Sequence, residues 1–591
     1  METGYWALAN CASMKGFPFR LRRCLLLACI AASPAAAATP AATVEALADR
    51  FVSQELAHDP TIAYEAGLET TVHDRFADRS PAAIRGFENS ERRDLAELLA
   101  IDPSALPMPA RATFANLREK LESDLQLRVC KSELWNVNHF DGWQSTFADA
   151  AERQPVATPS DRAQALRRWN SVPRFIDTEI ANLRTGLQQG YSAPRSVVRR
   201  VIEQMDFLTS GPVDKSPFFS PASRSADPAF QAAFRRLLMS RVNPALERYG
   251  EFLKTDYFPR ARDSVAISDL PNGPACYRAS LRAYTSLNRT PLEVYDLGRR
   301  TVAANEADVE RMGKTRFGTA DVASILKTIT NDPSEHFRSK DELLAFSRNF
   351  LARAKAKTAA FVIDALPVQN AIVEPERPFE DLAGTSSHYV AEPDDSKPAT
   401  FAIELGNFAS ETRAEAEITA VHEVWPGHHL QIALARQLQP PTRFSKLVSI
   451  SGYQEGWARY AEGLGEELGI YDDGDARIMR RIWPARGMVV DPGLHAFHWT
   501  RKQAIGYLVG TGRYTAKSAD DLVDRIAVMP GQLAAYDSGG LQIAGLRRHA
   551  QAALGSRFDL KSFDRAVLEE GVVPLAELSA HVEHWIARMH K

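Results

Sequence analysis

The amino-acid sequence predicts a mainly α-helical protein with one small β-sheet. Segments 228–254 and 291–312 place apolar residues three and four positions apart with charged residues between them, which is the spacing of an amphipathic helix. Helix starts are also well marked: Thr290 can cap a helix that has proline in its first turn, and Glu293 stands where it completes a capping box. The β-rich exception is residues 359–408.

The composition is that of a soluble globular protein. The chain has 591 residues, of which 45% are hydrophobic and 25% charged, and its formal net charge is −3. Basic and acidic residues are spread evenly along the sequence, so it has neither a basic stripe for nucleic acid nor an acidic tail for a charged partner. We therefore expect no nucleic-acid partner.

Residues 1–38 predict a secretory signal peptide that is removed. A basic stretch ending at Arg23 precedes a short apolar run, and three alanines close the segment at Ala38, which is typical of a signal peptide and too short for a membrane span. A disordered alanine-rich terminus is the alternative. Cys29 faintly resembles a lipoprotein cleavage site, although the apolar run before it is short. We expect a periplasmic or secreted protein without stable membrane insertion, in which residues 39–591 form a single large helical domain.

Removal of the signal peptide leaves two cysteines, Cys130 and Cys276. One disulfide would be permitted in an oxidising compartment. Two separately buried thiols are the favoured expectation, because free cysteine behaves as a small core hydrophobe. The sequence has no Cys-x-x-Cys or Cys/His cluster that would offer a sulfur-ligated metal site.

The β-rich region predicts a small sheet directly before the helix that carries the metal motif. The runs "AAFVIDALPVQNAIVEP" and "ATFAIELGNF" flank a segment full of turn residues. A sheet here could offer an extended peptide an edge for backbone hydrogen bonds, and the strand expected at 400–408 would align that peptide. The alternative, a sheet that merely covers helices, fits the pattern equally well.

The segment "HEVWPGHHLQ", residues 422–431, has the residues of a zinc-binding helix at an unusual spacing. In the motif His-Glu-x-x-His, the two histidines share one helix face and the glutamate, here Glu423, serves as base. His422 and His428 are six residues apart, which on a straight helix means a rotation of about 600° and a rise of about 9 Å. His429 would lie on the same face as His422, but about 10.5 Å along the axis. An unbroken helix therefore brings neither pair to one ion.

Pro426 and Gly427 predict a break in this helix, because proline removes a backbone donor and glycine adopts unusual dihedral angles at low cost. If Trp425 and Pro426 bulge out as a two-residue insertion, the spacing returns to that of His-Glu-x-x-His. His428 is then the second zinc ligand and His429 points elsewhere. From the residues alone, the choice between His428 and His429 stays open.

A third ligand is expected from the next helix, which begins at Ser451. Glu455 and Glu462 stand seven residues apart on one face of that helix. We expect Glu455 to bind the metal and Glu462 to fix the tautomer of a ligand histidine. Ordinary surface glutamates are the alternative, but the neighbouring Trp457 indicates a buried helix.

Zinc-assisted attack on an amide builds an oxyanion that needs hydrogen-bond donors besides the metal. Tyr536, between a Met-Pro-Gly-Gln segment and a pair of glycines, is the first candidate donor, and His495 is the second. Either could instead be a satisfied core residue, which is what we expect of His498.

Several blocks of the sequence resemble a known family. The blocks "HEVWPGHHLQ", "EGWARYAE", "VVDPGLHAFHWTRKQAIGYL" and "MPGQLAAY", with "GYSAPRSVVRRVIEQM" nearer the N-terminus, are similar in order to the bacterial family of domain of unknown function 885. The resemblance covers nearly all of the mature chain. That family is regarded as a distant relative of the helical zinc peptidases that include thimet oligopeptidase and carboxypeptidase Taq. It implies a two-lobed, almost all-α fold around a deep cleft, with the active-site region at 400–545.

The resemblance also implies roles for single residues. His422 and His428 match the histidine ligands of those peptidases, Glu455 the third ligand and Glu423 the base, and Tyr536 lies in the segment that holds their transition state. The sequence departs from the family in "YDSGGLQI", where a basic and an aliphatic residue usually follow the tyrosine. This departure is expected to bear on substrate preference.

Together these features predict an exported zinc-dependent metallopeptidase that hydrolyses amide bonds of short peptides. Its cofactor would be Zn²⁺, which activates a water molecule and polarises the scissile carbonyl while the glutamate moves the proton. Two other functions stay open. The protein could be a zinc amidase or isopeptidase that acts on a non-standard amide, or a catalytically inactive peptide-binding protein.

Overall fold

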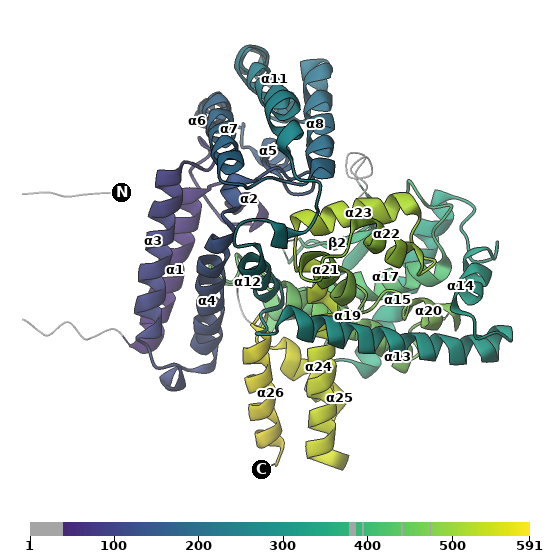
Figure 1. Cartoon of the computed structure of the whole chain (residues 1–591). Helices are drawn as coiled ribbons and strands as arrows, with labels where there is room; N and C mark the ends of the chain where they lie inside the picture. The colour runs from purple at the N-terminus through teal and green to yellow at the C-terminus, as the bar shows by residue number, and fades with distance from the viewer. Residues whose placement is uncertain (1–38, 377–385, 393–394, 439–440, 473, 591) are drawn as a thin grey trace, which may run out of the picture. The chain divides into compact units, whose positions relative to one another are not determined.

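The computed structural model describes residues 39–376, 386–392, 395–438, 441–472 and 474–590 (Figure 1). The chain from Pro40 onward forms one compact unit, while the predicted signal peptide, residues 1–38, lies outside the described residues. Helices dominate the unit, which confirms the mainly α fold. None of the helices among the described residues combines the length and the apolar character needed to cross a membrane.

The first four helices form the N-terminal part of this unit. They are α1 (Pro40–His58), α2 (Ile62–Glu65), α3 (Pro81–Leu99) and α4 (Met108–Leu127). The three long ones, α1, α3 and α4, pack side by side, as Figure 1 shows in purple and blue. Their shared core includes Phe51, Phe114 and the more distant Phe444, so this part is also tied to a loop late in the chain.

A second group of helices follows. It consists of α5 (Trp143–Arg153), α6 (Pro159–Asn170), α7 (Val172–Gln188), α8 (Arg195–Ser210), α9 (Ser220–Ser223), α10 (Pro228–Leu237) and α11 (Asn243–Phe252). Its core is rich in aromatic rings. Trp169 is fully buried, with its ring 5.2 Å from that of Phe218 and 5.8 Å from that of Phe234. Such contacts bury much apolar surface for each side chain.

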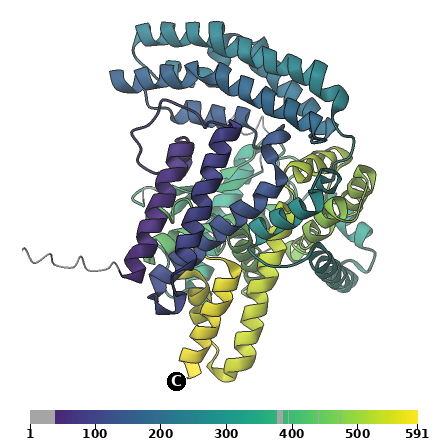
Figure 2. The same ribbon diagram turned by 60° about the vertical axis from the view of Figure 1, so that its left-hand side comes forward.

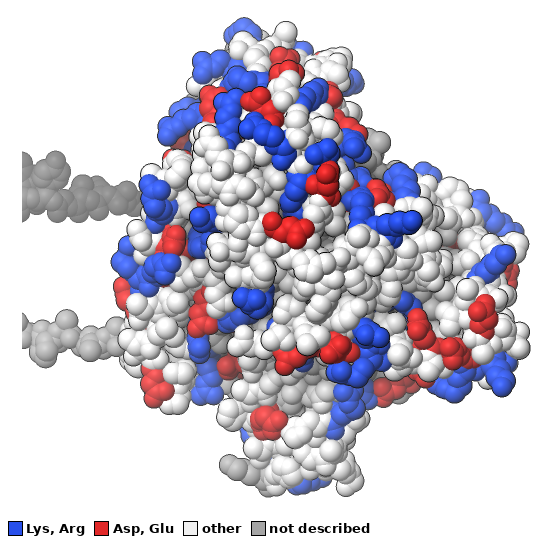
Figure 3. Space-filling model, in the orientation of Figure 1, with Lys and Arg blue, Asp and Glu red and all other residues white. Residues whose placement is uncertain are grey.

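The remaining helices form the largest part of the unit. They are α12 (Gly273–Thr285), α13 (Pro291–Phe317), α14 (Val322–Thr330), α15 (Lys340–Phe361), α17 (Arg413–Glu423), α18 (His428–Leu438), α19 (Ser451–Glu467), α20 (Gly474–Met479), α21 (Gly487–His495), α22 (Arg501–Val509), α23 (Ala516–Val528), α24 (Gln532–Leu554), α25 (Leu560–Leu568) and α26 (Leu575–His590). The C-terminal helices α24 and α26 run side by side in both views (Figures 1 and 2). On the face seen in Figure 3, basic and acidic side chains are interspersed.

The predicted helical segments are confirmed. Residues 228–254 are helical throughout, because a π-helical turn at Leu238–Val242 joins α10 to α11 and another begins at Leu253. The segment 291–312 lies within α13, where the Thr290 side chain accepts a hydrogen bond from the backbone of Glu293 and the capping box closes as expected.

The predicted sheet also forms, directly before the metal-motif helices. It has three strands, β1 (Ala371–Pro375), β2 (His388–Val390) and β3 (Ala399–Ile403), in the order β1-β3-β2. β3 runs parallel to β1 and antiparallel to β2. Val373 and Phe401 point from the sheet into the same core as the metal-motif helices.

The strand arrangement corrects one expectation. The strand predicted at 400–408 to align a peptide ends at Ile403, and it is the central strand, so both of its edges are already paired. Among the strands that the structure describes, β1 and β2 are the two edge strands of this sheet. The first β-rich run begins later than predicted, because α15 continues to Phe361.

The two cysteines of the mature chain are joined. Cys130, just after α4, forms a disulfide with Cys276 in α12, and both residues are buried. The expectation of two separate thiols is therefore wrong. Each cysteine sits in a core pocket as expected, but the packing of α12 against the end of α4 brings them together across a separation of 146 residues.

Candidate metal centre

The metal motif lies where one helix ends and the next begins. α17 ends at Glu423 and α18 begins at His428, so four residues between them are not helical. The backbone N–H of Leu430 donates to the carbonyl of Val424 at 3.3 Å, across six residues rather than the four of an α-helix. The hydrogen-bond pattern therefore skips two residues, which is the size of the insertion that the sequence predicts.

The break is held in place by its surroundings. Trp425, whose peptide bond to Pro426 is cis, is buried, and its ring packs edge-on against His429 at 4.6 Å. From α19, the indole N–H of Trp457 donates to the carbonyl of Pro426 at 2.9 Å. Gly427 has no room for a side chain, because a Cβ there would lie 1.8 Å from the carbonyl oxygen of His422.

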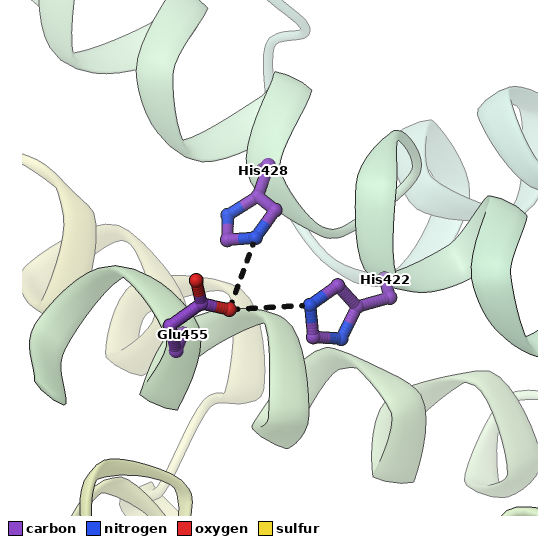
Figure 4. A group of neighbouring side chains, drawn as sticks. All are labelled: His422, His428 and Glu455. Carbon is purple, nitrogen blue, oxygen red and sulfur yellow. Dashed lines mark ion pairs between the residues drawn. The ribbon is translucent and has the colours of Figure 1, made fainter. Parts of the chain in front are cut away.

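The break brings three predicted ligands together. Nε2 of His422 lies 3.4 Å from Oε2 of Glu455, and Nε2 of His428 lies 3.5 Å from the same oxygen. The candidate ligand atoms of all three residues lie within 4.8 Å of one another. Figure 4 shows the two imidazoles and the carboxylate pointing toward one common point.

The donor set and its spacing fit a zinc ion. Zinc accepts imidazole nitrogen and carboxylate oxygen at about 2.0–2.2 Å, so neighbouring ligands of a tetrahedral site stand roughly 3.3–3.5 Å apart. The separations of Nε2 of His422 and Nε2 of His428 from Oε2 of Glu455 both fall in this range. Three protein ligands would leave a fourth position for water or substrate, which is the arrangement of a catalytic rather than a structural site.

The charges of the site support one another. Burial by itself raises the pKa of the Glu455 carboxyl, but the hydrogen bonds and charges of His422 and His428 hold that pKa well below its usual range. Burial lowers the pKa of His422, and its contacts with Glu455 and Glu462 outweigh that effect and raise the pKa to about 10. The carboxylates of this site therefore stabilise a positive charge placed between them.

Glu462 takes the supporting position that the sequence predicts for it. Its Oε1 lies 2.9 Å from Nδ1 of His422, which leaves Nε2 of that ring facing the candidate metal position. Such a carboxylate fixes the tautomer of a ligand histidine. A residue not singled out by the sequence, Arg459, holds Glu462 in turn, with Nη1 donating to both carboxylate oxygens at 2.8 and 2.9 Å.

The candidate base Glu423 is held by strand β2. Its Oε2 accepts a hydrogen bond from the backbone N–H of Tyr389 at 3.0 Å. The hydroxyl of Tyr389 lies 3.2 Å from Nδ1 of His429, and Nε2 of His429 donates to the carbonyl of Gln369 at 3.1 Å. His429 therefore points away from the three ligands and anchors the sheet to the motif. The sequence carries no local signal for the contact with Tyr389, which lies 34 residues before Glu423.

Tyr536 lies beside the metal position, as predicted. Its ring stacks at 6.4 Å from that of His422, and its hydroxyl accepts a hydrogen bond from the amide of Gln532 at 3.2 Å. Burial, and then the charge of Glu455, raises the pKa of this hydroxyl, so the group keeps its proton. Arg525 donates to Gln532 from the other side at 3.1 Å.

His495 has a different position from the one predicted. It is fully buried; its Nδ1 accepts from the backbone N–H of Ile267 at 3.1 Å, and its Nε2 donates to the carbonyl of Ile526 at 3.0 Å. With both ring nitrogens occupied by backbone groups, no donor is left for an oxyanion. His495 is the satisfied core residue that was its alternative, and His498, expected in the core, is exposed.

Close packing of two helices brings Glu455 and Tyr536 to the same site. α19 and α24 touch through glycines: a Cβ on Gly456 would lie 2.6 Å from the backbone of Gly539, and one on Gly539 would lie 1.7 Å from the carbonyl of Gly452. Only residues without a side chain allow this approach.

Comparisons with known proteins add the family and the fold. The model of a family described as "Bacterial protein of unknown function (DUF885)" matches residues 60–582. Among proteins with curated descriptions, none matches the chain.

Two solved structures are similar over nearly their whole length. A "putative lipoprotein" from Colwellia psychrerythraea is 21% identical, with a TM-score of 0.84 and coverage of 93% of this chain and 100% of that one. A "putative lipoprotein of unknown function" from Shewanella oneidensis is 17% identical, with a TM-score of 0.76 and coverage of 92% and 99%. At these identities the likeness concerns the fold.

Proposed function

The chain belongs to this family of bacterial proteins of unknown function, and from the geometry of its site we propose that it is a zinc-dependent peptidase that hydrolyses amide bonds of short peptides. The observation that carries the proposal is the convergence of His422, His428 and Glu455 on one point, with Glu423 next in the chain to a ligand. In metal-assisted amide hydrolysis, two imidazoles and a carboxylate bind the metal, and an adjacent glutamate serves as the base.

The three ligands would hold the zinc ion at the junction of α17, α18 and α19. When bound, zinc acts as a Lewis acid that polarises the scissile carbonyl and lowers the pKa of water. Glu462 keeps the His422 ring in the orientation that presents Nε2 to the ion.

Glu423 would be the general base and acid. Its carboxylate removes a proton from the attacking water and returns it to the leaving amine, so that no proton is gained or lost over the reaction. The hydrogen bond from the backbone of Tyr389 orients this carboxylate without using a titratable group.

Tyr536 would stabilise the oxyanion. As a neutral hydroxyl beside His422, it can donate a hydrogen bond to the oxygen on which negative charge develops. Gln532 supports the tyrosine by donating to its oxygen, which leaves the phenolic proton free for the substrate.

β2 would align the peptide, in place of the strand predicted at 400–408. β2 is an edge strand, and the backbone N–H of Tyr389 already points away from β3 toward Glu423. An extended peptide could pair with this edge next to the base.

We also propose that the protein is exported. The basic, apolar and alanine-rich order of residues 1–38 is typical of a signal peptide, and the two similar structures are described as lipoproteins. If the chain is anchored as a lipoprotein, cleavage would precede Cys29 instead of following Ala38, and Cys29 would carry the lipid. Labelling with radioactive palmitate in the bacterial host, compared between the wild type and Cys29→Ser, separates an anchored from a freely soluble exported form.

The central test combines metal analysis with a library of short peptides. We expect about one zinc per chain, and peptide cleavage that falls by about 100-fold to 10,000-fold in Glu423→Gln while zinc is retained. Zinc without cleavage of any peptide would point to another amide as substrate, and absence of zinc would leave a peptide-binding protein. Glu310→Gln, the same chemical change at an exposed position of α13, serves as the matched control.

A further inference from the structure

A buried ion-pair chain extends from the metal centre to the helix that carries Tyr536. Arg459 of α19 binds Glu462 with Nη1, and its Nε lies 3.1 Å from Oδ1 of Asp537 in α24. The Arg459 side chain is 12% exposed, while those of Glu462 and Asp537 are 3% and 4% exposed. Four side chains are thus connected in series, from His422 through Glu462 and Arg459 to Asp537.

Asp537 is buried and faces Arg459 of α19. It follows Tyr536 directly, so on a helix the two side chains point in directions about 100° apart. Tyr536 faces His422, and Asp537 faces α19. Ser538 is fully buried as well. The departure from the family pattern at these two residues, expected to bear on substrate preference, lies instead at the interface of the two helices.

A buried charge network needs a physical reason. Removing an aspartate and an arginine from water costs several kcal/mol, and well-packed apolar residues often stabilise a protein as much. Buried ion pairs are retained most clearly where they fix a register between elements. The glycine contacts set how closely α19 approaches α24, and the ion pair of Arg459 with Asp537 adds a buried polar contact between these helices beside the metal-binding residues.

The guanidinium of Arg459 contacts two carboxylates, each through a different nitrogen atom. Nη1 holds both oxygens of Glu462, and Nε lies beside Asp537, so the planar group has one orientation that serves both contacts. Without Asp537 the guanidinium can turn about its side-chain bonds. Glu462 would then lose its fixed position, and with it the hydrogen bond that aims His422.

We propose that Arg459 and Asp537 are positioning residues, which hold Glu462 and thereby His422 for the metal and lock α24, with Tyr536, to the metal-binding helix. The inference rests on the proposed zinc site, but not on the identity of the amide that is cut. Neither residue contacts the metal position itself.

The test measures metal affinity rather than activity alone. Asp537→Asn removes the charge and keeps the size, and we expect it to weaken Zn²⁺ binding by about 3-fold to 10-fold in competition with a chromophoric chelator, less than the roughly 10-fold to 100-fold for loss of a group that contacts a ligand directly. With Co²⁺ in place of Zn²⁺, we expect its visible absorption bands to shift, since they report the ligand arrangement. Arg459→Lys keeps the positive charge but loses the planar set of N–H donors, and it should reduce the Zn²⁺ affinity by a smaller factor.

Glu467→Gln is the matched control. Glu467 and Arg547 form a second ion pair between α19 and α24, with hydrogen bonds of 2.6 and 2.8 Å, away from the metal position. Breaking this pair loosens the same interface but should leave the Zn²⁺ affinity and the Co²⁺ spectrum as in the wild type. Thermal unfolding of all metal-free variants shows whether any effect is a general loss of folding.

The outcomes separate this inference from the proposed function. Wild-type Zn²⁺ affinity and an unchanged Co²⁺ spectrum in Asp537→Asn would overturn the positioning role, even if the protein is a peptidase. Equal loss of affinity in Glu467→Gln would also overturn it, because the effect would then be one of interface stability. A wild type that binds zinc but cleaves no peptide overturns the proposed function and leaves the positioning role intact.

Discussion

Two histidines at helix ends, His422 with a side chain 13% exposed and His495 fully buried, show how their neighbours decide what an imidazole can do. His422 is in the last turn of α17 and His495 is the last residue of α21. Both have partners at both ring nitrogens. Those of His422 are the carboxylates of Glu455 and Glu462, while those of His495 are a backbone N–H and a backbone carbonyl.

The same desolvation therefore leads to opposite results. Burial lowers the pKa of His495 to about 3, and its partners carry no net charge that could oppose this effect. At His422 burial also lowers the pKa, but two carboxylates overcome it and raise the pKa to about 10. The carboxylates beside His422 therefore favour a positive charge there, whereas the backbone partners of His495 leave that ring neutral within the core.

The largest effect is expected from replacing a candidate metal ligand. His422→Ala and Glu455→Ala should lose zinc binding by more than the roughly 100-fold that loss of an outer partner costs, and peptide cleavage should disappear with it. The fold should persist, because both side chains are partly exposed to solvent and the apolar core around the site is unchanged. Metal analysis after dialysis, together with circular dichroism, checks both statements. Full zinc occupancy in either variant would show that the ligand set is wrong.

The break between α17 and α18 should be nearly as sensitive. Gly427→Ala places a Cβ against the backbone carbonyls of His422 and Val421, at 1.8 and 2.4 Å, and rigid backbone atoms cannot yield. We expect a loss of about 3 kcal/mol in the free energy of unfolding, and weaker zinc binding because His422 and His428 move apart. Urea titration of the metal-free protein and chelator competition measure the two effects.

Gly506→Ala in α22, where nothing lies within 4 Å of the new Cβ, is the matched control. It should be neutral or slightly stabilising. A Gly427→Ala protein as stable as this control would contradict the steric account of the break.

Substitution of His495 should lower the free energy of unfolding and should not change metal binding. His495→Ala leaves the N–H of Ile267 and the carbonyl of Ile526 without partners in the core, so we expect a loss of about 2–4 kcal/mol in the free energy of unfolding. His498→Ala, at an exposed position nearby, should change it by less than about 0.5 kcal/mol. Equal unfolding curves for the two variants would refute the structural role of His495.

The smallest effect, over a test range of pH 7.5 to 5.5, is expected from a pH dependence with a defined sign. His495 binds a proton at a pKa of about 3 when folded and near 6.5 when unfolded, so the unfolded state takes up the proton first as the pH falls. The stability that His495 contributes is therefore present above pH 6.5 and is lost toward pH 3, at no more than about 1.4 kcal/mol per pH unit.

This contribution can be isolated by subtraction. The difference in unfolding free energy between the wild type and His495→Gln, measured in urea at pH 7.5, 6.5 and 5.5, should shrink as the pH falls. A difference that stays constant over this range would mean that the His495 environment does not disfavour the protonated ring.

Parts of the site could be read from the sequence because helix geometry is periodic. A bulge of two residues returns His422 and His428 to a four-residue spacing, and glutamates seven residues apart share one helix face. The positions of the candidate ligands and of Glu462 could therefore be predicted from residue spacing. The same counting places Arg459 between Glu455 and Glu462 on that face, and its role could have been suspected. The role of its partner Asp537 could not be predicted, because neither segment alone indicates that α19 packs against α24.

Other features depended on contacts between distant segments. The order of the three strands, which makes β3 central and β2 the edge, follows from packing on the helices and not from β propensity. The contact of Tyr389 with Glu423 and the pairing of Cys130 with Cys276 join segments 34 and 146 residues apart. His495 was misjudged because its residue type fits both a catalytic and a core role, and only its partners distinguish them.

The sequence by itself determined the helical class of this protein, the sheet before the motif, the break at Pro426 and Gly427 and the identity of the candidate ligands, because each is encoded in local spacing and backbone preference. The tertiary structure alone decided which carboxylates surround which imidazole, which strand is central in the sheet and which histidine remains neutral. These depend on electrostatic and steric contacts between segments whose separation along the chain has no fixed relation to their distance in space.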